Sequence, residues 1–166
     1  IDAIRISLSQ SPRSSREPLL RKIVVTVHRR ENHGKRLEEI CHAMRSLAQQ
    51  FPKIRLLFFL HPNPHIRGPA AKMLSGIENI DLVEPLDHLS FIQLLQESLF
   101  VVTDSGGIQE ETSFLGKPVL VLRDTTERPE SILAGTSRLV GTDCSTILAH
   151  CKELLENEET RRVMSR

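Results

Sequence analysis

The chain has 166 residues, of which 39% are hydrophobic, so it suits a single domain with a proper core and is not a disordered chain. Its 22 basic and 21 acidic side chains leave no general basic field, and it lacks Trp and Tyr for stacking on single strands. No run approaches the ~20 apolar residues of a membrane span, and no secretory signal is evident. We therefore expect a cytoplasmic protein without nucleic-acid or membrane partners.

Residues 1–22 are irregular, with a possible short helix over 1–8 and a linker rich in Ser, Arg and Pro after it. From residue 23 onward, short apolar runs alternate with segments of helical periodicity. The runs predict strands over 23–27, 54–60, 80–83, 99–103, 119–122 and 138–140. The periodic segments predict helices around 37–48, 64–74, 89–95, 105–115, 129–134 and 147–155.

This alternation predicts an α/β fold with a parallel sheet covered on both faces. Right-handed crossovers then give a doubly wound, Rossmann-like domain over residues 23–166, preceded by an interdomain linker over 1–22. The strand at 23–27 is β-branched nearly throughout, as is typical of a strand buried on both faces.

The three cysteines are odd in number and form no CxxC pair, which argues against a disulfide framework and a zinc site. Cys41 and Cys151 fall on apolar helical faces and are expected in the core. His61 and His65 share a loop but lack further ligands, so we expect no metal. No P-loop, GxSxG or GxGxxG occurs, and no cofactor is expected.

Ligands of open parallel sheets bind beyond the carboxyl ends of the strands. Four segments with unusual polar residues lie at such ends: 28–32, 61–64, 104–107 and 123–129. The topology would bring them to one edge of the sheet, which is the expected place of the functional site.

Ser105-Gly106-Gly107 stands at a strand-to-helix junction, with Asp104 as the expected helix cap. Two glycines let a phosphate approach backbone N–H groups at the positive end of a helix, and the Ser105 hydroxyl adds a donor. The alternative is a helix cap in which glycine serves close packing.

Glu111 lies four residues after Gly107, on the same helical face. Helical side chains tilt toward the N-terminus, so its carboxylate would point toward the glycines and could accept both hydroxyls of a ribose. Phosphate at the glycines and ribose at Glu111 describe a nucleotide. The alternative is a solvated helix residue, which is our interpretation of Glu110.

His28 follows a buried strand and is crowded by Arg29 and Arg30, which suggests a loop that faces phosphate. Arg128, beside Pro129 at a helix start, could hold a diphosphate by bidentate contact. The alternatives are a structural histidine and surface salt bridges.

Together these segments resemble bacterial non-hydrolysing UDP-N-acetylglucosamine 2-epimerases. Residues 27–32 are similar to the family's GHRREN segment and residues 104–111 to its DSGGIQEE segment; residues 115–120 and 123–130 match the segments that follow. The resemblance spans residue 23 to about 166, and residues 1–3 resemble the family's interdomain helix.

The resemblance implies the second domain of a glycosyltransferase-B-type fold, the domain that holds UDP. It implies that Ser105, Gly106 and Gly107 bind the diphosphate and that Glu111 binds the ribose. His28, as the catalytic candidate, and Arg128 would face the diphosphate and the sugar. The remaining implied contacts are Phe91 against uracil, main chain near Leu86 to the base, and His61 near the place where some members bind an activating UDP-sugar.

The family interconverts UDP-GlcNAc and UDP-ManNAc through loss and re-addition of UDP, with the C2 proton handled by the first domain. That domain is absent from this sequence, so we expect the fragment alone to be inactive. The resemblance also implies that the full enzyme is a homodimer. Two alternatives are a catalytically inactive UDP-sugar-binding or regulatory protein and the nucleotide domain of a glycosyltransferase.

Two departures from the family's pattern stand out. Val27 replaces the usual glycine before His28, and Phe114 occupies a position where the family has a small residue. The bulk of Phe114 is expected to alter helix packing.

Overall fold

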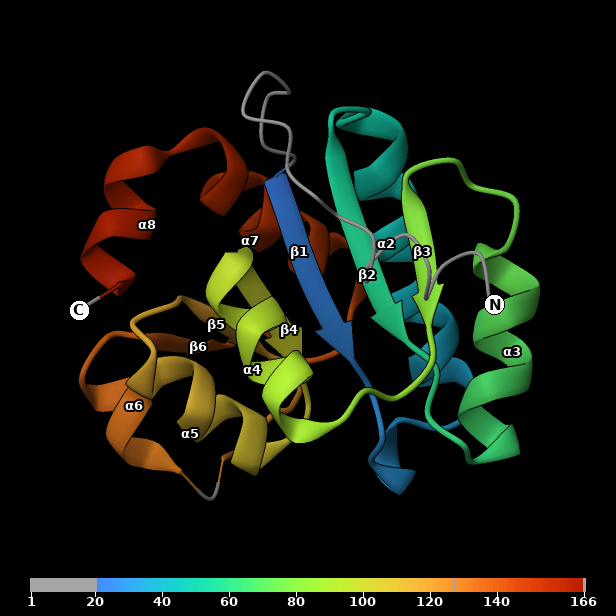
Figure 1. The fold of residues 1–166 in the computed structure, drawn as a ribbon, viewed down its shortest axis with the longest axis horizontal. Helices are drawn as coiled ribbons and strands as arrows, with labels where there is room; N and C mark the ends of the chain where they lie inside the picture. Colours follow the sequence, from blue (N-terminus) through green and yellow to red (C-terminus); the bar gives the residue numbers. More distant parts are fainter. Residues whose placement is uncertain (1–20, 127, 166) are drawn as a thin grey trace.

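The computed structural model describes residues 21–126 and 128–165. Their strands form one parallel sheet of six strands in the order β3-β2-β1-β4-β5-β6 (Figure 1). The strands are β1 (Arg21–Thr26), β2 (Ile54–Phe59), β3 (Ile80–Val83), β4 (Ser98–Thr103), β5 (Val119–Val121) and β6 (Ser137–Leu139). This arrangement confirms the predicted doubly wound α/β fold.

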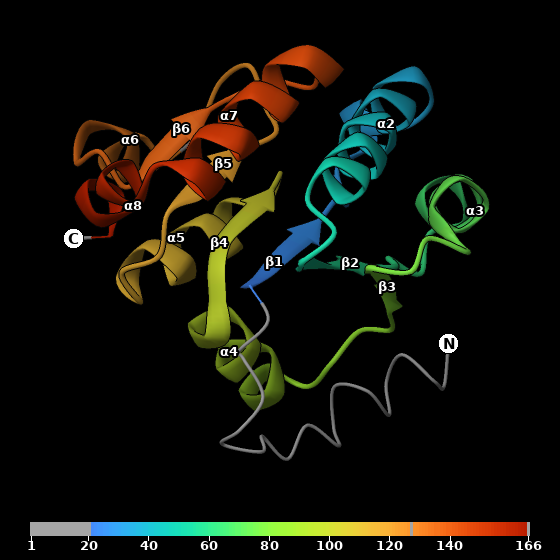
Figure 2. The same ribbon diagram turned by 90° about the horizontal axis from the view of Figure 1, so that it is seen from above.

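Helices connect successive strands and lie on both faces of the sheet, as the view from above shows (Figure 2). They are η1 (Arg30–Asn32), α2 (Lys35–Gln50), α3 (Pro64–Leu74), α4 (His88–Glu97), α5 (Gly106–Phe114), α6 (Pro129–Leu133), α7 (Cys144–Glu156) and α8 (Glu158–Met164). On one face lie α2, α3 and α7, and on the other lie α4 and α5. None of the helices in the described part of the chain is long and apolar enough to cross a bilayer.

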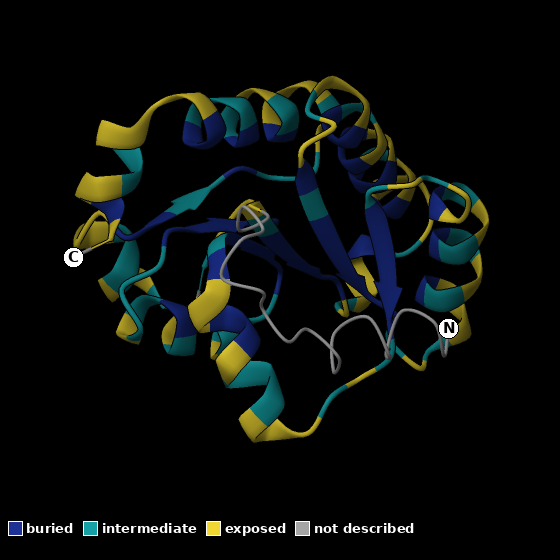
Figure 3. Ribbon diagram, turned by 45° about the horizontal axis from the view of Figure 1, so that its top comes forward, coloured by how far each residue is buried: buried dark blue, intermediate teal, exposed yellow. Residues whose placement is uncertain are grey.

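Two hydrophobic cores sandwich the sheet because successive side chains of a strand point to opposite faces. In β1, Ile23 and Val25 pack into the larger core with α2, α3 and α7, whereas Val24 packs into the smaller one with α4. The central strands are therefore buried on both sides, and exposed positions concentrate on the outer surfaces of the helices (Figure 3). The continuous β-branched run in β1 is the sequence pattern that this double burial requires.

The buried cysteines behave as core residues, as predicted. Cys41 of α2 and Cys151 of α7 are both 0% exposed and belong to the larger core. Burial raises the pKa of each thiol to about 12, with the Glu38 carboxylate adding to the effect at Cys41. Neither thiol is a reactive nucleophile in the folded chain.

The structure differs from the predicted elements near both ends of the described chain. β1 begins at Arg21, two residues inside the expected linker, because Arg21 and Lys22 continue the parallel register with β2. A final helix, α8, was not predicted; Asn157 caps it by accepting a hydrogen bond from the backbone N–H of Thr160. The helix expected over 1–8 lies outside the described residues.

Phe114 does not alter helix packing, contrary to the expectation. It is the last residue of α5 and is 91% exposed, so its ring extends away from the core. Leu115 caps the helix, and the chain then turns at Gly116, whose φ of 76° lies in the left-handed region that favours glycine.

Two phenylalanines test the division between core and surface. Phe58→Ala should lower the free energy of unfolding by about 3–5 kcal/mol, because it removes a fully buried ring from β2. Phe114→Ala, the matched control, should change it by less than about 0.5 kcal/mol. Urea denaturation followed by far-UV circular dichroism measures both, since the chain has no Trp or Tyr for fluorescence. Equal losses in the two variants would contradict the assigned core.

Candidate functional site

The order in which the chain adds strands to the sheet reverses between the two central strands, β1 and β4. From β1 the chain winds outward through β2 and β3, and then returns to β4 on the other side of β1. This is the topological switch point, where the loops that leave neighbouring strands separate and open a crevice beyond the carboxyl ends. The segments after β1 and β4 contain His28 and the Ser105-Gly106-Gly107 sequence, so the fold brings these two predicted segments together.

The first turn of α5 presents free backbone donors at this edge. Ser105 is its N-cap: its Oγ accepts from the Ile108 amide at 3.2 Å, and its carbonyl accepts from the Gln109 amide at 2.9 Å. The amides of Gly106 and Gly107 have no acceptor among the described residues. The helix start can therefore receive an anion. The anion would accept from these two amides and from the Ser105 hydroxyl, and the positive end of the helix dipole would attract it.

Asp104 is not the helix cap that the sequence suggested. Its side chain is 0% exposed and turns toward the segment after β1. The carboxylate accepts from the His28 amide at 3.0 and 3.1 Å, from the Arg29 amide at 2.9 Å and from Asn32 Nδ2 at 2.8 Å. The Asp104 carbonyl accepts from Arg29 Nε at 2.9 Å. A buried carboxylate needs such partners, so the loops after β1 and β4 form one unit.

This unit also places the imidazole of His28 beside the Asp104 carboxylate. Its Nε2 lies 3.6 Å from Asp104 Oδ1, and its ring stacks on His61 with 6.1 Å between the ring centroids. The His28 side chain keeps 41% of its surface exposed, so it remains accessible to a ligand. His61 is oriented in turn, because its Nδ1 accepts from the Asn63 amide at 3.1 Å.

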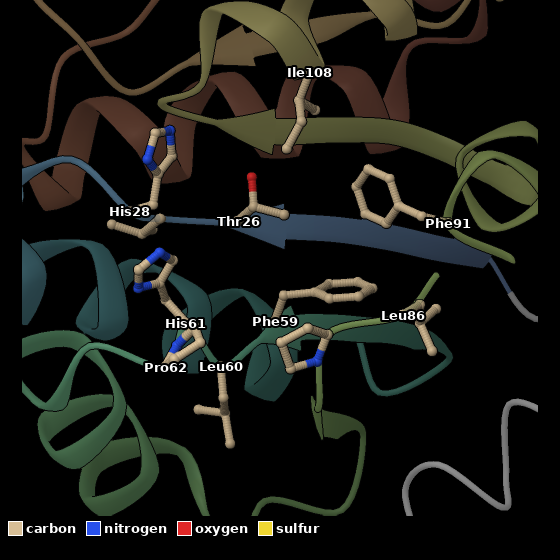
Figure 4. A pocket seen from close by; sticks show the side chains of 11 residues that line it. Thr26, His28, Phe59, Leu60, His61, Pro62, Leu86, Phe91 and Ile108 are labelled. Carbon is tan, nitrogen blue, oxygen red and sulfur yellow. The ribbon is translucent and has the colours of Figure 1, made fainter. Parts of the chain in front are cut away.

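An apolar cavity of about 310 Å³ opens between these loops and α4 (Figure 4). Phe91 of α4 meets Phe59 edge to face, with 5.2 Å between the ring centroids, so its orientation is fixed. Ile108, in the first turn of α5, completes the wall and connects the cavity to the glycine amides. The lining residues are Thr26, Val27, His28, Phe59, Leu60, His61, Pro62, Pro85, Leu86, Phe91 and Ile108.

Arg128 lies against the glycines from the opposite side. A Cβ on Gly106 would stand 3.0 Å from Arg128 Nε and 3.4 Å from its Cγ, so the bare glycine lets this side chain pack directly on the start of α5. Gln109 fixes the backbone here: its Nε2 donates to the Arg128 carbonyl at 3.2 Å and to Ser131 Oγ at 2.7 Å. The structure therefore places the predicted cation beside the predicted anion site.

Glu111 lies in a neighbouring groove. Its carboxylate is 3.4 Å from His88 Nε2 at the start of α4, and its side chain is 38% exposed. A groove between α4 and α5, lined by Ile92, Glu110, Glu111, Phe114 and Leu115, adjoins it. Glu111 thus links the second turn of α5 to the first turn of α4 and does not line the cavity that contains His28, Leu86 and Phe91.

Sequence reasoning missed two buried polar residues of this site, Asp104 as a loop anchor and Gln109. Both flank the Ser-Gly-Gly sequence, and both are 1% exposed or less. A polar residue next to bare glycines in a largely apolar environment was the available signal. Within the described residues, no group of three or more His, Cys, Asp or Glu side chains is arranged to hold a metal ion.

Comparison with known proteins identifies the family. The family profile described as "UDP-N-acetylglucosamine 2-epimerase" matches residues 1–166. The chain belongs to this epimerase family.

Curated members of the epimerase family are identical to this chain at nearly half of the aligned positions. A probable UDP-N-acetylglucosamine 2-epimerase from Ralstonia nicotianae is 48% identical over 146 residues, which are 88% of this chain and 39% of the relative. The Escherichia coli K12 UDP-N-acetylglucosamine 2-epimerase is 46% identical over 150 residues, which are 90% of this chain and 40% of the relative. The chain thus spans about two fifths of the length of these relatives.

Solved structures of epimerases have the same fold. The Neisseria meningitidis UDP-GlcNAc 2-epimerase bound to UDP-GlcNAc superposes with a TM-score of 0.88 at 39% identity, covering 99% of this chain and 47% of that one. A Staphylococcus aureus MnaA structure with UDP gives 0.85 at 39% identity, covering 99% and 46%. The spinosyn rhamnosyltransferase SpnG, at 15% identity and a TM-score of 0.66 over 90% and 41%, shows the glycosyltransferase-like fold alone.

The Asp104 anchor has a local signature in solution. Asp104→Asn should lower the free energy of unfolding by about 1–3 kcal/mol, because buried N–H donors lose a charged acceptor. Amide hydrogen exchange of His28 and Arg29 should accelerate more than that of residues in β2, as NMR can measure.

Asp124→Asn is the matched control. The Asp124 side chain is 68% exposed, and its Oδ2 lies 3.4 Å from Arg36 Nη2, which is a long, solvent-exposed ion pair. That change should leave stability within about 0.5 kcal/mol. Unchanged protection of His28 and Arg29 in Asp104→Asn would show that the carboxylate does not hold the loop.

Proposed function

We propose that the chain is the UDP-binding part of an enzyme that interconverts UDP-GlcNAc and UDP-ManNAc by eliminating UDP and adding it back. One observation carries the proposal: an apolar cavity lined by His28, Leu86 and Phe91 adjoins a helix N-terminus with bare glycine amides, at the switch point of the sheet. A base-sized pocket beside an anion site matches the two ends of a nucleoside diphosphate. Family membership and the ligand named for the Neisseria structure support this assignment.

The apolar end of the cavity would take the uracil base. Phe91 offers a ring whose orientation Phe59 fixes, and the backbone near Leu86 can supply a hydrogen bond to the base. An aromatic wall alone would accept any base, so the backbone contact is the element that selects uracil. Glu111, one turn after the glycines, would accept the ribose hydroxyls in place of its contact with His88.

The diphosphate would lie at the first turn of α5. Gly106 and Gly107 provide amides, Ser105 provides a hydroxyl, and Arg128 approaches from the α6 side. As the bond between the sugar and UDP breaks, negative charge grows on the departing phosphate. Fixed donors aimed at that charge stabilise the transition state more than the ground state, which is how this part of the enzyme would accelerate the elimination.

His28 would face the sugar. Asp104 and His61 lie beside its ring, while its exposed side keeps it accessible. We propose that the groups that move the C2 proton belong to a further domain, since the chain spans only two fifths of its relatives. We further propose a cytoplasmic homodimer for the complete enzyme and a contact of His61 with an activating second UDP-sugar.

Two other functions compete with this proposal: glycosyl transfer and a purely regulatory role without catalysis. The likeness to the rhamnosyltransferase SpnG lies at 15% identity, so it carries no argument for group transfer. Nothing in the geometry of the cavity favours a regulatory role over the epimerase role.

Nucleotide selectivity tests the binding site. Isothermal titration of the chain with UDP, UDP-GlcNAc, GDP and ADP should show a preference for the uridine nucleotides. Glu111→Ala should weaken UDP binding by about 1.5–3 kcal/mol, because it removes a charged hydrogen bond to the ribose. Glu78→Ala, an exposed glutamate before β3, is the control and should bind as the unaltered chain does. A preference for GDP or ADP would exclude the epimerase assignment.

Activity is tested in a chimaera. Replacing the matching segment of the Escherichia coli relative by this chain, to which it is 46% identical, should give an enzyme that forms UDP-ManNAc from UDP-GlcNAc. His28→Ala in that chimaera should reduce kcat about a hundredfold or more, as for loss of a group that acts on the reacting sugar. His42→Ala, on the exposed side of α2, is the matched control. Full turnover in the His28 variant would remove this residue from the mechanism.

A further inference from the structure

The guanidinium of Arg128 is already paired with a carboxylate of its own chain. Arg128 Nη1 donates to Glu110 Oε2 at 2.7 Å, across the gap between α5 and the segment before α6. At the same time the arginine stem lies against Gly106, where the anion site begins. The cation that the diphosphate would use is therefore occupied by Glu110.

Glu110 approaches this cation because of its place on α5. It lies four residues after Gly106, one turn along the helix, and helical side chains tilt back toward the N-terminus. Its side chain is 57% exposed and that of Arg128 is 43% exposed, so both can move without disturbing the core. An ion pair between such exposed groups is weak, which makes it exchangeable.

The backbone of Arg128 stays in place while its side chain exchanges partners. Gln109 is 1% exposed and donates to the Arg128 carbonyl, and the Arg128 amide donates to Thr126 Oγ1 at 2.9 Å. Thr126 Oγ1 in turn donates to Gln109 Oε1 at 3.3 Å. This network confines the exchange to the arginine side chain and keeps the guanidinium within reach of the glycine amides.

We propose that Glu110 competes with the diphosphate of the ligand for Arg128 and thereby sets the affinity of the site for phosphate. The inference rests on the proposed function and deepens it. In the unliganded chain, Glu110 neutralises Arg128. When the ligand binds, the phosphate oxygens take over the guanidinium in bidentate contact, and Glu110 turns into solvent. A negative side chain so close to the anion site weakens binding of the departing UDP and so favours its release.

The test compares Glu110→Gln with the unaltered chain by titration with UDP and with uridine. Glu110→Gln should bind UDP about two- to fivefold more tightly, the range expected for loss of one exposed competing ion pair. Uridine binding should not change, because uridine carries no phosphate. In an Arg128→Ala background, Glu110→Gln should no longer tighten UDP binding.

Glu130→Gln is the matched control. Glu130 is an exposed acid in the first turn of α6, two residues from Arg128. Glu130→Gln removes the same charge, but among the described residues Arg128 forms its ion pair with Glu110 and not with Glu130. Equal tightening by Glu130→Gln, or UDP binding that is unchanged or weaker in Glu110→Gln, would overturn the proposal. If the unaltered chain fails to bind UDP at all, the proposed function falls first and this inference with it.

Discussion

The site depends on one buried carboxylate. Asp104 follows the last residue of β4, is completely buried, and accepts hydrogen bonds from the amides of His28 and Arg29 and from the Asn32 side chain. A buried charge without such donors would cost several kcal/mol, on the order of the desolvation penalty of an ion in a protein interior. The loops after β1 and β4 are therefore locked to each other, and His28 and the glycine pair keep a fixed relation.

A second buried polar group does the same on the other side of the glycines. Gln109 ties α5 to the segment that carries Arg128, and Gly106 leaves the space in which the arginine stem lies. The first turn of α5 is thus supported from both sides by residues of its own sequence neighbourhood. Because this support is internal, the backbone of the candidate anion site is preorganised, and only the exposed side chains around it would need to rearrange for a ligand.

The fold was readable from the sequence, and the site only in part. Buried β-branched runs such as 23–25 and the helical stripe of α2 reflect burial directly, so strands and helices could be placed to within a few residues. The role of Asp104 could not, since a polar residue after a strand can cap the next helix or turn to a neighbouring loop, and only the register of β1 with β4 decides which. Glu110 pairs with Arg128, and Glu111 lies beside His88. Both partners are far away in the sequence, so the periodicity of a single helix could not predict these contacts.

These pairings explain how a chain of nearly balanced charge can hold an anion. The net charge is +1, so long-range attraction contributes little. Near the glycines, Arg128 faces Glu110 and His88 faces Glu111, while Arg29 donates to the Asp104 carbonyl. Both arginines are thus already engaged, and under the proposed function a diphosphate would bind by exchanging with internal acceptors rather than by filling an open positive patch. Such a site would discriminate by geometry, because only an anion that reaches both the glycine amides and the guanidinium would offset the contacts that it replaces.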